Sequence, residues 1–214
     1  GRVFRQFWQP ALLSEELPVA DCPPVRVRLM GEDFVAFRDS SGKVGLLDAH
    51  CPHRLADLFF GRNEEGGLRC VYHGWKFSVA GEILDMPSEP QGSPMRCNPN
   101  LRAKAYPVRE AGGIIWAYLG PQESMPALPD MEFMSLPPQN VHVSKCLMKC
   151  NYLQALEGSI DTAHLTFLHH SMAPMEKDVF AVGNLQEFGD ADGAPRFFCE
   201  DTDFGMRISA RRDG

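Results

Sequence analysis

The stretch CPHRLADLFFGRNEEGGLRCVYHGW, residues 51–75, contains the residues that decide the fold of this chain. It holds two pairs of soft metal ligands with sixteen residues between the pairs: Cys51 and His53, then Cys70 and His73. Each pair follows a β-prone run and adjoins a turn-forming residue, Pro52 in the first and Gly74 in the second. Two such loops can close over one metal centre from opposite sides.

Two thiolates and two imidazoles are compatible with two kinds of site. One is a tetrahedral zinc site. The other is a [2Fe–2S] cluster with both cysteines on one iron and both histidines on the other. Zinc sites of this composition usually pair Cys with Cys and His with His, whereas each loop here supplies one of each. The spacing therefore favours the cluster, and the C-x-H…C-x-x-H arrangement resembles that of the Rieske proteins.

The subtype can be read from two further positions. Rieske proteins of respiratory chains carry an additional cysteine in each loop, and the two form a disulfide beside the cluster. The matching positions here are Ala56 and Tyr72, so this disulfide cannot form. The sequence therefore resembles the oxygenase and ferredoxin branch, which implies a potential toward the low end of the Rieske range of about −150 to +300 mV.

The residues around the two loops predict an antiparallel β-sandwich. Residues 34–48 are two alternating runs joined by a Ser-Gly turn, and residues 75–86 repeat this pattern around Ala80-Gly81. Residues 112–120 form another β-prone run. Short strands at this spacing predict a small sandwich domain over residues 25–120.

Three further parts are predicted outside the sandwich: an N-terminal segment that packs on a catalytic domain (1–24), a Pro-rich linker (121–139) and the first part of the catalytic domain itself (140–214). Within the last part, residues 141–149 could be a strand. Residues 151–170 follow a helical period, and residues 197–212 are typical of a strand pair. The sequence stops directly after that pair, so a C-terminally truncated chain is expected.

The composition of the chain limits the number of domains and the classes of partner. The 214 residues carry a formal net charge of −7 and are 44% hydrophobic, which suits one large domain or two small ones. An acidic balance without a basic run argues against nucleic acid or an anionic membrane as a partner. No apolar run approaches the roughly 20 residues needed to span a bilayer. Seven scattered cysteines do not resemble a secreted disulfide framework, so a cytoplasmic location is expected.

A second candidate site lies in IDTAHLTFLHH, residues 160–170. On an ideal helix Glu157, Asp161 and His164 share one face. His169 lies five residues past His164, about 140° round the helix. Both histidines can bind one metal only if the helix kinks or carries a π-bulge between them. From spacing alone, an amphipathic helix with a polar face is an equal alternative.

The order D-x-x-H-x4-H after a Rieske domain resembles the α subunits of Rieske non-haem iron oxygenases, the aromatic-ring-hydroxylating family. The runs GRNEEGGLRCVYHGWKF and DMPSEP are similar to the phthalate dioxygenase and phenoxybenzoate dioxygenase subgroup. The resemblance covers essentially the whole chain. It implies His164 and His169 as ligands of a mononuclear Fe(II). It also implies an α+β fold, in which the β-sandwich Rieske domain precedes a helix-grip-like catalytic domain of helix and antiparallel sheet.

A site with two histidines also needs a carboxylate on the same iron. Glu157 lies roughly 10 Å from His164 along the helix axis, which is too far to share a metal. The resemblance gives Asp161 another role, that of a bridge between metal centres. In the family the third ligand is an acid much further along, so the carboxylate is expected to lie outside this sequence.

The resemblance also implies partners. The family forms head-to-tail homotrimers, sometimes stacked into hexamers, in which His73 of one chain hydrogen-bonds Asp161 of the next and Asp161 holds His164. A reductase with flavin and an iron–sulfur centre takes electrons from NADH. With O₂ and an aromatic substrate, the product is a cis-dihydrodiol, a monohydroxylated compound or a demethylated one.

The subgroup suggests an aromatic carboxylate as substrate. Arg207, Arg211 or Arg212 could pair with it, because guanidinium suits bidentate carboxylate binding, and Arg207 is the candidate we name. Strand alternation more simply places all three in solvent. Two other functions stay open. One is a Rieske-type electron carrier without oxygenase chemistry, against which the residues beyond Pro138 count. The other is a zinc-stabilised binding module.

Overall fold

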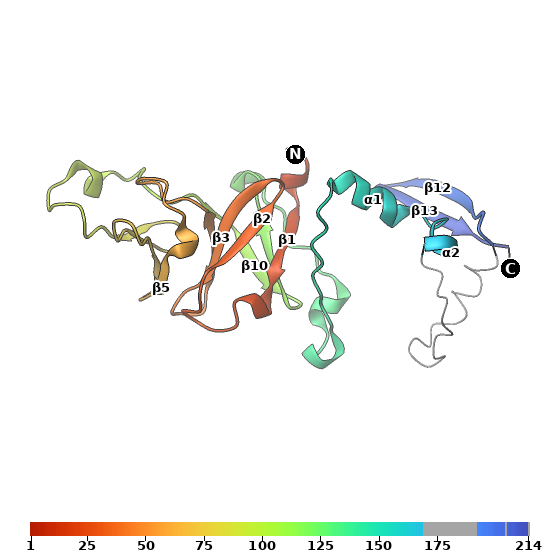
Figure 1. The fold of residues 1–214 in the computed structure, drawn as a ribbon, viewed down its shortest axis with the longest axis horizontal. Coiled ribbons are helices and arrows are strands. Elements are labelled where there is room, and N and C mark those ends of the chain that lie inside the picture. The colour runs from red at the N-terminus through yellow and green to blue at the C-terminus, as the bar shows by residue number, and fades with distance from the viewer. Residues whose placement is uncertain (169–191, 204, 214) are drawn as a thin grey trace. The chain divides into compact units, whose positions relative to one another are not determined.

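The computed structural model describes residues 1–168, 192–203 and 205–213 (Figure 1). The chain divides into two compact units, Gly1–Lys145 and Cys146–Gly214. The first unit is built from antiparallel strands, and the second combines helix with a strand pair. This mixed architecture agrees with the predicted α+β class.

Three antiparallel sheets make up the first unit. One has the order β2-β3-β4-β9, with strands Val25–Leu29, Glu32–Arg38, Val44–Asp48 and Ala105–Tyr106. A second has the order β1-β11-β10, with strands Trp8–Leu13, Ile114–Tyr118 and Val108–Ala111. The third has the order β5-β6-β7-β8, with strands Arg62–Glu64, Gly67–Arg69, Lys76–Phe77 and Ile83–Asp85. Short 3-10 helices lie before, between and after the strands: η1 (Phe4–Gln6), η2 (Ser14–Glu16), η3 (Leu58–Phe60), η4 (Pro94–Cys97), η5 (Gln122–Ser124), η6 (Glu132–Ser135) and η7 (Pro138–Asn140).

The predicted hairpins and the strand at residues 112–120 are confirmed. Strands β3 and β4 pair in an unbroken register from Phe34 opposite Asp48 to Arg38 opposite Val44. Strands β7 and β8 pair around the Ala80-Gly81 turn, with an irregularity at Lys76. These elements were readable because each is set by local alternation and an adjacent turn.

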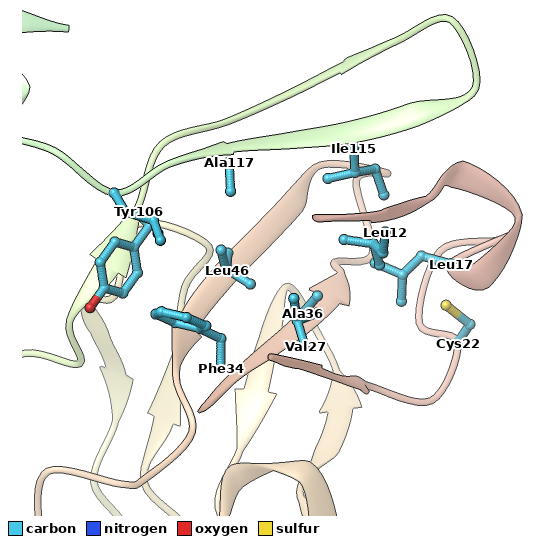
Figure 2. Close-up of a cluster of buried hydrophobic side chains, with 11 residues drawn as sticks. Leu12, Leu17, Cys22, Val27, Phe34, Ala36, Leu46, Tyr106, Ile115 and Ala117 are labelled. Carbon is cyan, nitrogen blue, oxygen red and sulfur yellow. The ribbon is translucent and has the colours of Figure 1, made fainter. Parts of the chain in front are cut away.

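The first hydrophobic core fills the space between the sheets of β3 and β11. Figure 2 shows Phe34 and Leu46 facing Ala117 and Ile115 across this space, and all four side chains are at most 1% exposed. Tyr106 closes one end of the core, where its ring meets Phe34 edge to face at 4.9 Å between centroids. The two sheets therefore form the predicted sandwich.

Strand β3 is buried on both faces, because successive side chains point to opposite sides of a strand. Val35 and Phe37 belong to a second core rather than to the first. That core also includes residues of β6 and β7 and of the two loops with metal-ligand residues: Cys51, Leu68, Cys70, Trp75 and Phe77. The cysteine-bearing loops thus stand directly on packed hydrophobic residues.

The N-terminal segment contributes a strand to the first unit. Strand β1 pairs with β11, from Trp8 opposite Tyr118 to Leu13 opposite Ile114. Residues 1–24 are therefore tied into the sandwich by hydrogen bonds. Packing of this segment on the catalytic domain stays a prediction.

The Pro-rich segment lies on the sandwich. Partly buried side chains between Met125 and Met134 pack against Trp8, Trp116 and Tyr118, and the Trp8 indole donates to the Pro126 carbonyl at 2.9 Å. Gly112, in the turn before β11, has a positive φ of 61°, and a Cβ on it would lie 2.6 Å from the Phe133 ring. The segment therefore packs as a layer over the aromatic residues Trp8, Trp116 and Tyr118.

The second unit contains α1 (Tyr152–Ile160), α2 (Leu165–Leu168) and the hairpin of β12 (Arg196–Thr202) and β13 (Gly205–Arg211). The hairpin confirms the predicted strand pair. Residues 141–149, all of them described, form no strand, and that expectation was wrong. A strand needs a partner for its backbone groups, which β propensity alone does not supply. No helix in the described parts of the chain is long and apolar enough to cross a membrane.

Candidate metal centres

The two cysteine–histidine loops close by the same pair of backbone hydrogen bonds. In the first, the Cys51 N–H donates to the Ala56 carbonyl at 2.8 Å and the Leu55 N–H to the Cys51 carbonyl at 2.9 Å. In the second, the Cys70 N–H donates to the Trp75 carbonyl at 2.8 Å and the Gly74 N–H to the Cys70 carbonyl at 3.1 Å. Each loop is therefore a tight turn that begins at a cysteine.

The fourth residue after each cysteine is left-handed. Gly74 has a φ of 75° and Leu55 a φ of 57°. Glycine adopts this conformation freely, whereas a leucine there is strained by roughly 1–2 kcal/mol. Since strained residues concentrate where the surrounding structure requires a particular backbone, the first loop is held by its contacts.

The four predicted ligands come together as two pairs. Cys51 and Cys70 are each only 2% exposed, and Cys70 lies close enough to Cys51 to raise the pKa of its thiol. The rings of His53 and His73 meet edge to face, with 4.5 Å between centroids. Thiols thus pair with thiols and imidazoles with imidazoles, although each loop contributes one of each.

This arrangement distinguishes the two readings of the site. Tetrahedral zinc needs four ligands around a single point. A [2Fe–2S] cluster of the Rieske type needs two thiolates on one iron and two imidazoles on the other. The geometry therefore fits the cluster.

Aromatic side chains fix the two imidazoles. The His53 ring stacks on the buried Trp75 indole at 4.4 Å between centroids, with only 2° between the planes. The Tyr72 ring lies 3.9 Å from that of His73. The His53 Nδ1 atom is buried and has no hydrogen-bond partner in the described parts of the protein. A buried imidazole nitrogen without a partner is costly unless it binds a metal, so this atom fits a ligand of the histidine-bound iron.

Burial shapes the protonation of the two ligands in the first loop, Cys51 and His53. Burial raises the pKa of Cys51 to about 11, and Cys70 adds to this, while the His53 and Arg54 backbone N–H groups donate to the sulfur and lower it. Burial, with His73 and Arg54, lowers the pKa of His53. A histidine that binds a metal must be a neutral imidazole and a cysteine a thiolate, and backbone N–H donors stabilise a thiolate. The raised pKa of Cys51 does not oppose this, because a bound metal deprotonates the thiol.

A charged network stands behind the second loop. Arg69, the last residue of β6, donates from Nη1 to the Gly74 carbonyl at 2.7 Å and to Asp85 Oδ2 at 2.8 Å. Its Nε donates to Glu64 Oε1 at 2.7 Å. The pKa of Asp85 is lowered, chiefly by the hydrogen bond from Arg69. Sequence reasoning missed this network, because a charged residue in a strand carries no signal of which loop it faces.

The second candidate site lies where α1 ends. Asp161 follows the last residue of α1 with an extended ψ of 123°, so the helix stops one residue before it. The predicted sharing of a helix face by Glu157, Asp161 and His164 is therefore wrong. The reason is local: Asp161 Oδ1 accepts the Ala163 N–H at 2.8 Å, which competes with continuation of the helix.

Asp161 and His164 are nevertheless neighbours. Asp161 Oδ2 lies 3.2 Å from His164 Nδ1. The pKa of Asp161 is lowered chiefly by the Ala163 N–H and also by His164. A carboxylate at Nδ1 fixes the orientation of the ring, and Nε2 is then the nitrogen that would bind a metal. His169, the other predicted ligand, lies outside the described residues.

The three candidate substrate arginines differ. Arg207 and Arg211 are exposed; Arg207 pairs with Glu200 at 3.1 Å and Arg211 approaches Asp213 at 3.6 Å. Arg212 donates to Thr166 Oγ1 at 3.0 Å and to the Thr162 carbonyl, on both sides of His164. The hydrogen bonds of Arg212 thus stabilise the connection between α1 and α2. Substrate binding by Arg207 stays a prediction.

Comparison with known proteins agrees with this geometry. Residues 7–107 match the Rieske [2Fe-2S] domain, and residues 117–214 match a family described as LigXa C-terminal domain like. The chain belongs to the Rieske oxygenase family. Residues 7–107 of the first unit are accordingly a Rieske domain, and the resemblance inferred from the motifs is confirmed.

Individual Rieske oxygenases match nearly all of the chain. A 3-chlorobenzoate-3,4-dioxygenase oxygenase subunit from Comamonas testosteroni is 50% identical over 211 residues, 99% of this chain and 48% of the relative. A phthalate 4,5-dioxygenase oxygenase subunit from Pseudomonas putida is 42% identical over 214 residues, 99% of this chain and 48% of the relative. The chain spans about half the length of these relatives.

A solved structure supports the fold. Dicamba monooxygenase bound to 3,6-dichlorosalicylic acid superposes with a TM-score of 0.71, at 23% identity, over 95% of this chain and 54% of that one. The predicted fold, a β-sandwich followed by helix and antiparallel sheet, is therefore confirmed.

Proposed function

We propose that this chain provides the Rieske cluster and two histidine ligands of the mononuclear iron in a terminal oxygenase. That oxygenase hydroxylates or O-dealkylates an aromatic carboxylate. The observation that carries the proposal is the pairing of buried thiols with thiols and imidazoles with imidazoles, together with the Asp161–His164 contact. The first part suits one-electron transfer, and the second suits a metal site oriented by a carboxylate.

The chain's own residues divide the work. Cys51 and Cys70 would hold one iron of the cluster, and His53 and His73 the other. When bound, the cluster supplies single electrons and the mononuclear Fe(II) supplies the site where O₂ is activated. Trp75 keeps the His53 plane fixed by stacking and shields it from water. Two rigid imidazoles limit the rearrangement that accompanies each electron transfer.

At the second site, Asp161 would orient His164 through Nδ1, and His164 and His169 would bind Fe(II). In the proposed homotrimer, or a hexamer of two trimers, Asp161 also accepts a hydrogen bond from His73 of the neighbouring chain. The exposure of Asp161, 45% for its side chain, is compatible with a second donor from outside. A carboxylate between two imidazoles orients both rings and couples their charges.

Substrate and partners belong to the same proposal. Two relatives are named for chlorobenzoate and phthalate, both aromatic carboxylates, which supports that substrate class. Their description as oxygenase subunits supports a separate electron donor, which we take to be an NADH-dependent reductase with flavin and an iron–sulfur centre. We place the protein in the cytoplasm, where its seven thiols would stay reduced.

The test of the bridging role is Asp161→Asn. We expect iron and sulfide contents equal to those of the unchanged protein, a preserved Rieske signal in electron paramagnetic resonance (EPR), and loss of product formation and of cluster reoxidation by O₂. The reason is that an amide keeps the shape of the carboxylate but not its charge or both acceptor oxygens. The matched control is Glu157→Gln, an exposed acid one turn earlier, which should leave turnover unchanged. Retained turnover in the Asp161 variant would exclude the bridge.

A second candidate function is an electron carrier without oxygenase chemistry. The observation that favours it is that all four cluster ligands lie in the first unit. Iron and acid-labile sulfide per chain, with EPR of the dithionite-reduced protein, separate the candidates. Three irons and two sulfides support the oxygenase; two irons and two sulfides support the carrier. Zinc without sulfide would contradict both.

A further inference from the structure

We propose that Arg69 and Asp85 position the second cluster loop and set the reduction potential of the Rieske cluster through their opposite charges. The inference rests on the cluster assignment and not on the oxygenase chemistry. It concerns two residues that bind no metal and that lie on different strands, β6 and β8.

The first support is the place of Arg69 in the chain. It directly precedes the ligand Cys70, and its Nη1 donates at 2.7 Å to the carbonyl of Gly74, the residue that directly follows the ligand His73. The side chain thus links the two ends of the loop, and both ligands lie between these ends in the sequence. A change in Arg69 would act on Cys70 and His73 together.

The second support is the role of Asp85. The same Nη1 atom that reaches Gly74 also donates to Asp85 Oδ2 at 2.8 Å. The Arg69 side chain is only 14% exposed, so its orientation is restricted. Because Asp85 holds the donor atom itself, the carboxylate determines how the guanidinium meets the loop. Charge-assisted bonds of this kind are short and directional.

Other charges surround the pair and must be considered. Glu64 Oε1 accepts from Arg69 Nε at 2.7 Å, and Glu64 also pairs with Arg62 at 3.1 Å. Glu65 lies 3.9 Å from Arg69 and pairs with Lys76 at 3.1 Å. Glu64 and Glu65 therefore each have a second cation within ion-pair distance, whereas Asp85 has Arg69 as its ion-pair partner among the described residues and Lys76 as a weaker Coulombic neighbour. Removing Asp85 should change the field at the loop most directly.

The sign of each effect follows from the charge that the cluster gains. Reduction transfers one electron from a reductant such as dithionite to the cluster, which becomes more negative by one unit. A nearby cation favours the reduced form and a nearby carboxylate disfavours it. Arg69→Gln should therefore lower the reduction potential, and Asp85→Asn should raise it. A purely structural role predicts no such opposition.

The experiment is an EPR-monitored redox titration of the full chain at one fixed pH, with iron and sulfide counted for every variant. We expect opposite shifts for Arg69→Gln and Asp85→Asn at unchanged cluster content. Arg69→Lys should show a smaller shift than Arg69→Gln, because lysine keeps the positive charge but lacks the several N–H donors of the guanidinium. Arg62→Gln is the matched control. Arg62 also pairs with Glu64, but its side chain is 62% exposed, so the reduction potential of the cluster should be unchanged in this variant.

The outcomes decide the proposal. Shifts of the same sign, or no shift in either variant, would overturn it and leave a network that only stabilises the sheet. If Arg69→Gln loses the cluster, Asp85→Asn alone decides: an upward shift supports the proposal, and an unchanged potential overturns it. Loss of the cluster from both variants would also overturn the potential-setting role. Turnover is not used, so failure of the oxygenase proposal would be seen separately.

Discussion

At the scale of single residues, the cluster site depends on backbone positions as much as on its ligands. Leu55 and Gly74 occupy equivalent places in two loops closed by equivalent hydrogen bonds, yet only one is glycine. The ligands were predictable because Cys and His at fixed spacing have specific chemistry. The left-handed Leu55 was not predictable, because nothing in a leucine indicates a positive φ.

The two loop positions should respond oppositely to substitution. Gly74→Ala introduces a Cβ at a φ of 75° and 2.7 Å from Pro87 Cγ, so we expect a loss of about 1–2 kcal/mol or more in unfolding free energy. Leu55→Gly removes strain but gains chain entropy in the unfolded state, so stability should stay level or rise by less than about 1 kcal/mol. Urea unfolding followed by the visible absorption of the cluster measures both. A large loss for Leu55→Gly would mean that its side chain, not its backbone, holds the loop.

At the scale of elements, β3 joins both hydrophobic cores, and its last residue joins two sheets. Arg38 forms a two-pronged ion pair with Glu110 of β10, at 2.9 and 3.0 Å, and donates to the Leu17 carbonyl at 2.7 Å. Strand pairing was predictable from alternation within each run. This cross-sheet pair was not, because 72 residues separate its members and their positions carry no local pattern. The end of α1 was likewise missed, because the Asp161 side-chain bond to Ala163 depends on geometry.

The Arg38–Glu110 pair predicts a pH-dependent stability. Hydrogen bonding to Arg38 lowers the pKa of Glu110. Its contribution is therefore fully present above the unfolded-state pKa of about 4.3 and is lost as pH falls through the lower folded-state value. Glu110→Gln should cost about 1–2 kcal/mol at pH 7, after allowance for solvent screening of a partly exposed carboxylate.

Urea unfolding by circular dichroism at several pH values checks this. The difference between Glu110→Gln and the unchanged protein should be constant from about pH 7 to 5 and should shrink below about pH 4.3. The exposed Glu123→Gln serves as a control and should change little at any pH. A Glu110→Gln difference that does not vary with pH would show that the carboxylate charge contributes nothing.

At the scale of the whole molecule, the two units differ in how much of a core they contain. Every buried hydrophobic side chain among the described residues lies in the first unit, the last of them at Leu119. The described residues of the second unit leave large apolar side chains such as Phe167 and Phe198 exposed. The two-domain order was predictable from the motifs. The packing of the segment after residue 120 on Trp8 and Trp116 was not, because the composition of this segment is that of a linker.

This difference predicts that the first unit is sufficient for the cluster. A chain ending at Lys145 should fold and bind two irons and two sulfides, with the EPR spectrum of the full chain. It keeps both hydrophobic cores, the packing around Trp8, Trp116 and Tyr118, and all four ligands. A chain ending at Gly120 should bind the same cluster but unfold at lower urea. It exposes Trp8, Trp116 and Tyr118, and each large side chain buried stabilises by about 1.5–3 kcal/mol. Failure of the longer fragment to bind sulfide would show that the second unit is needed to build the cluster. Equal stability of the two fragments would show that the Pro-rich segment is only a connection.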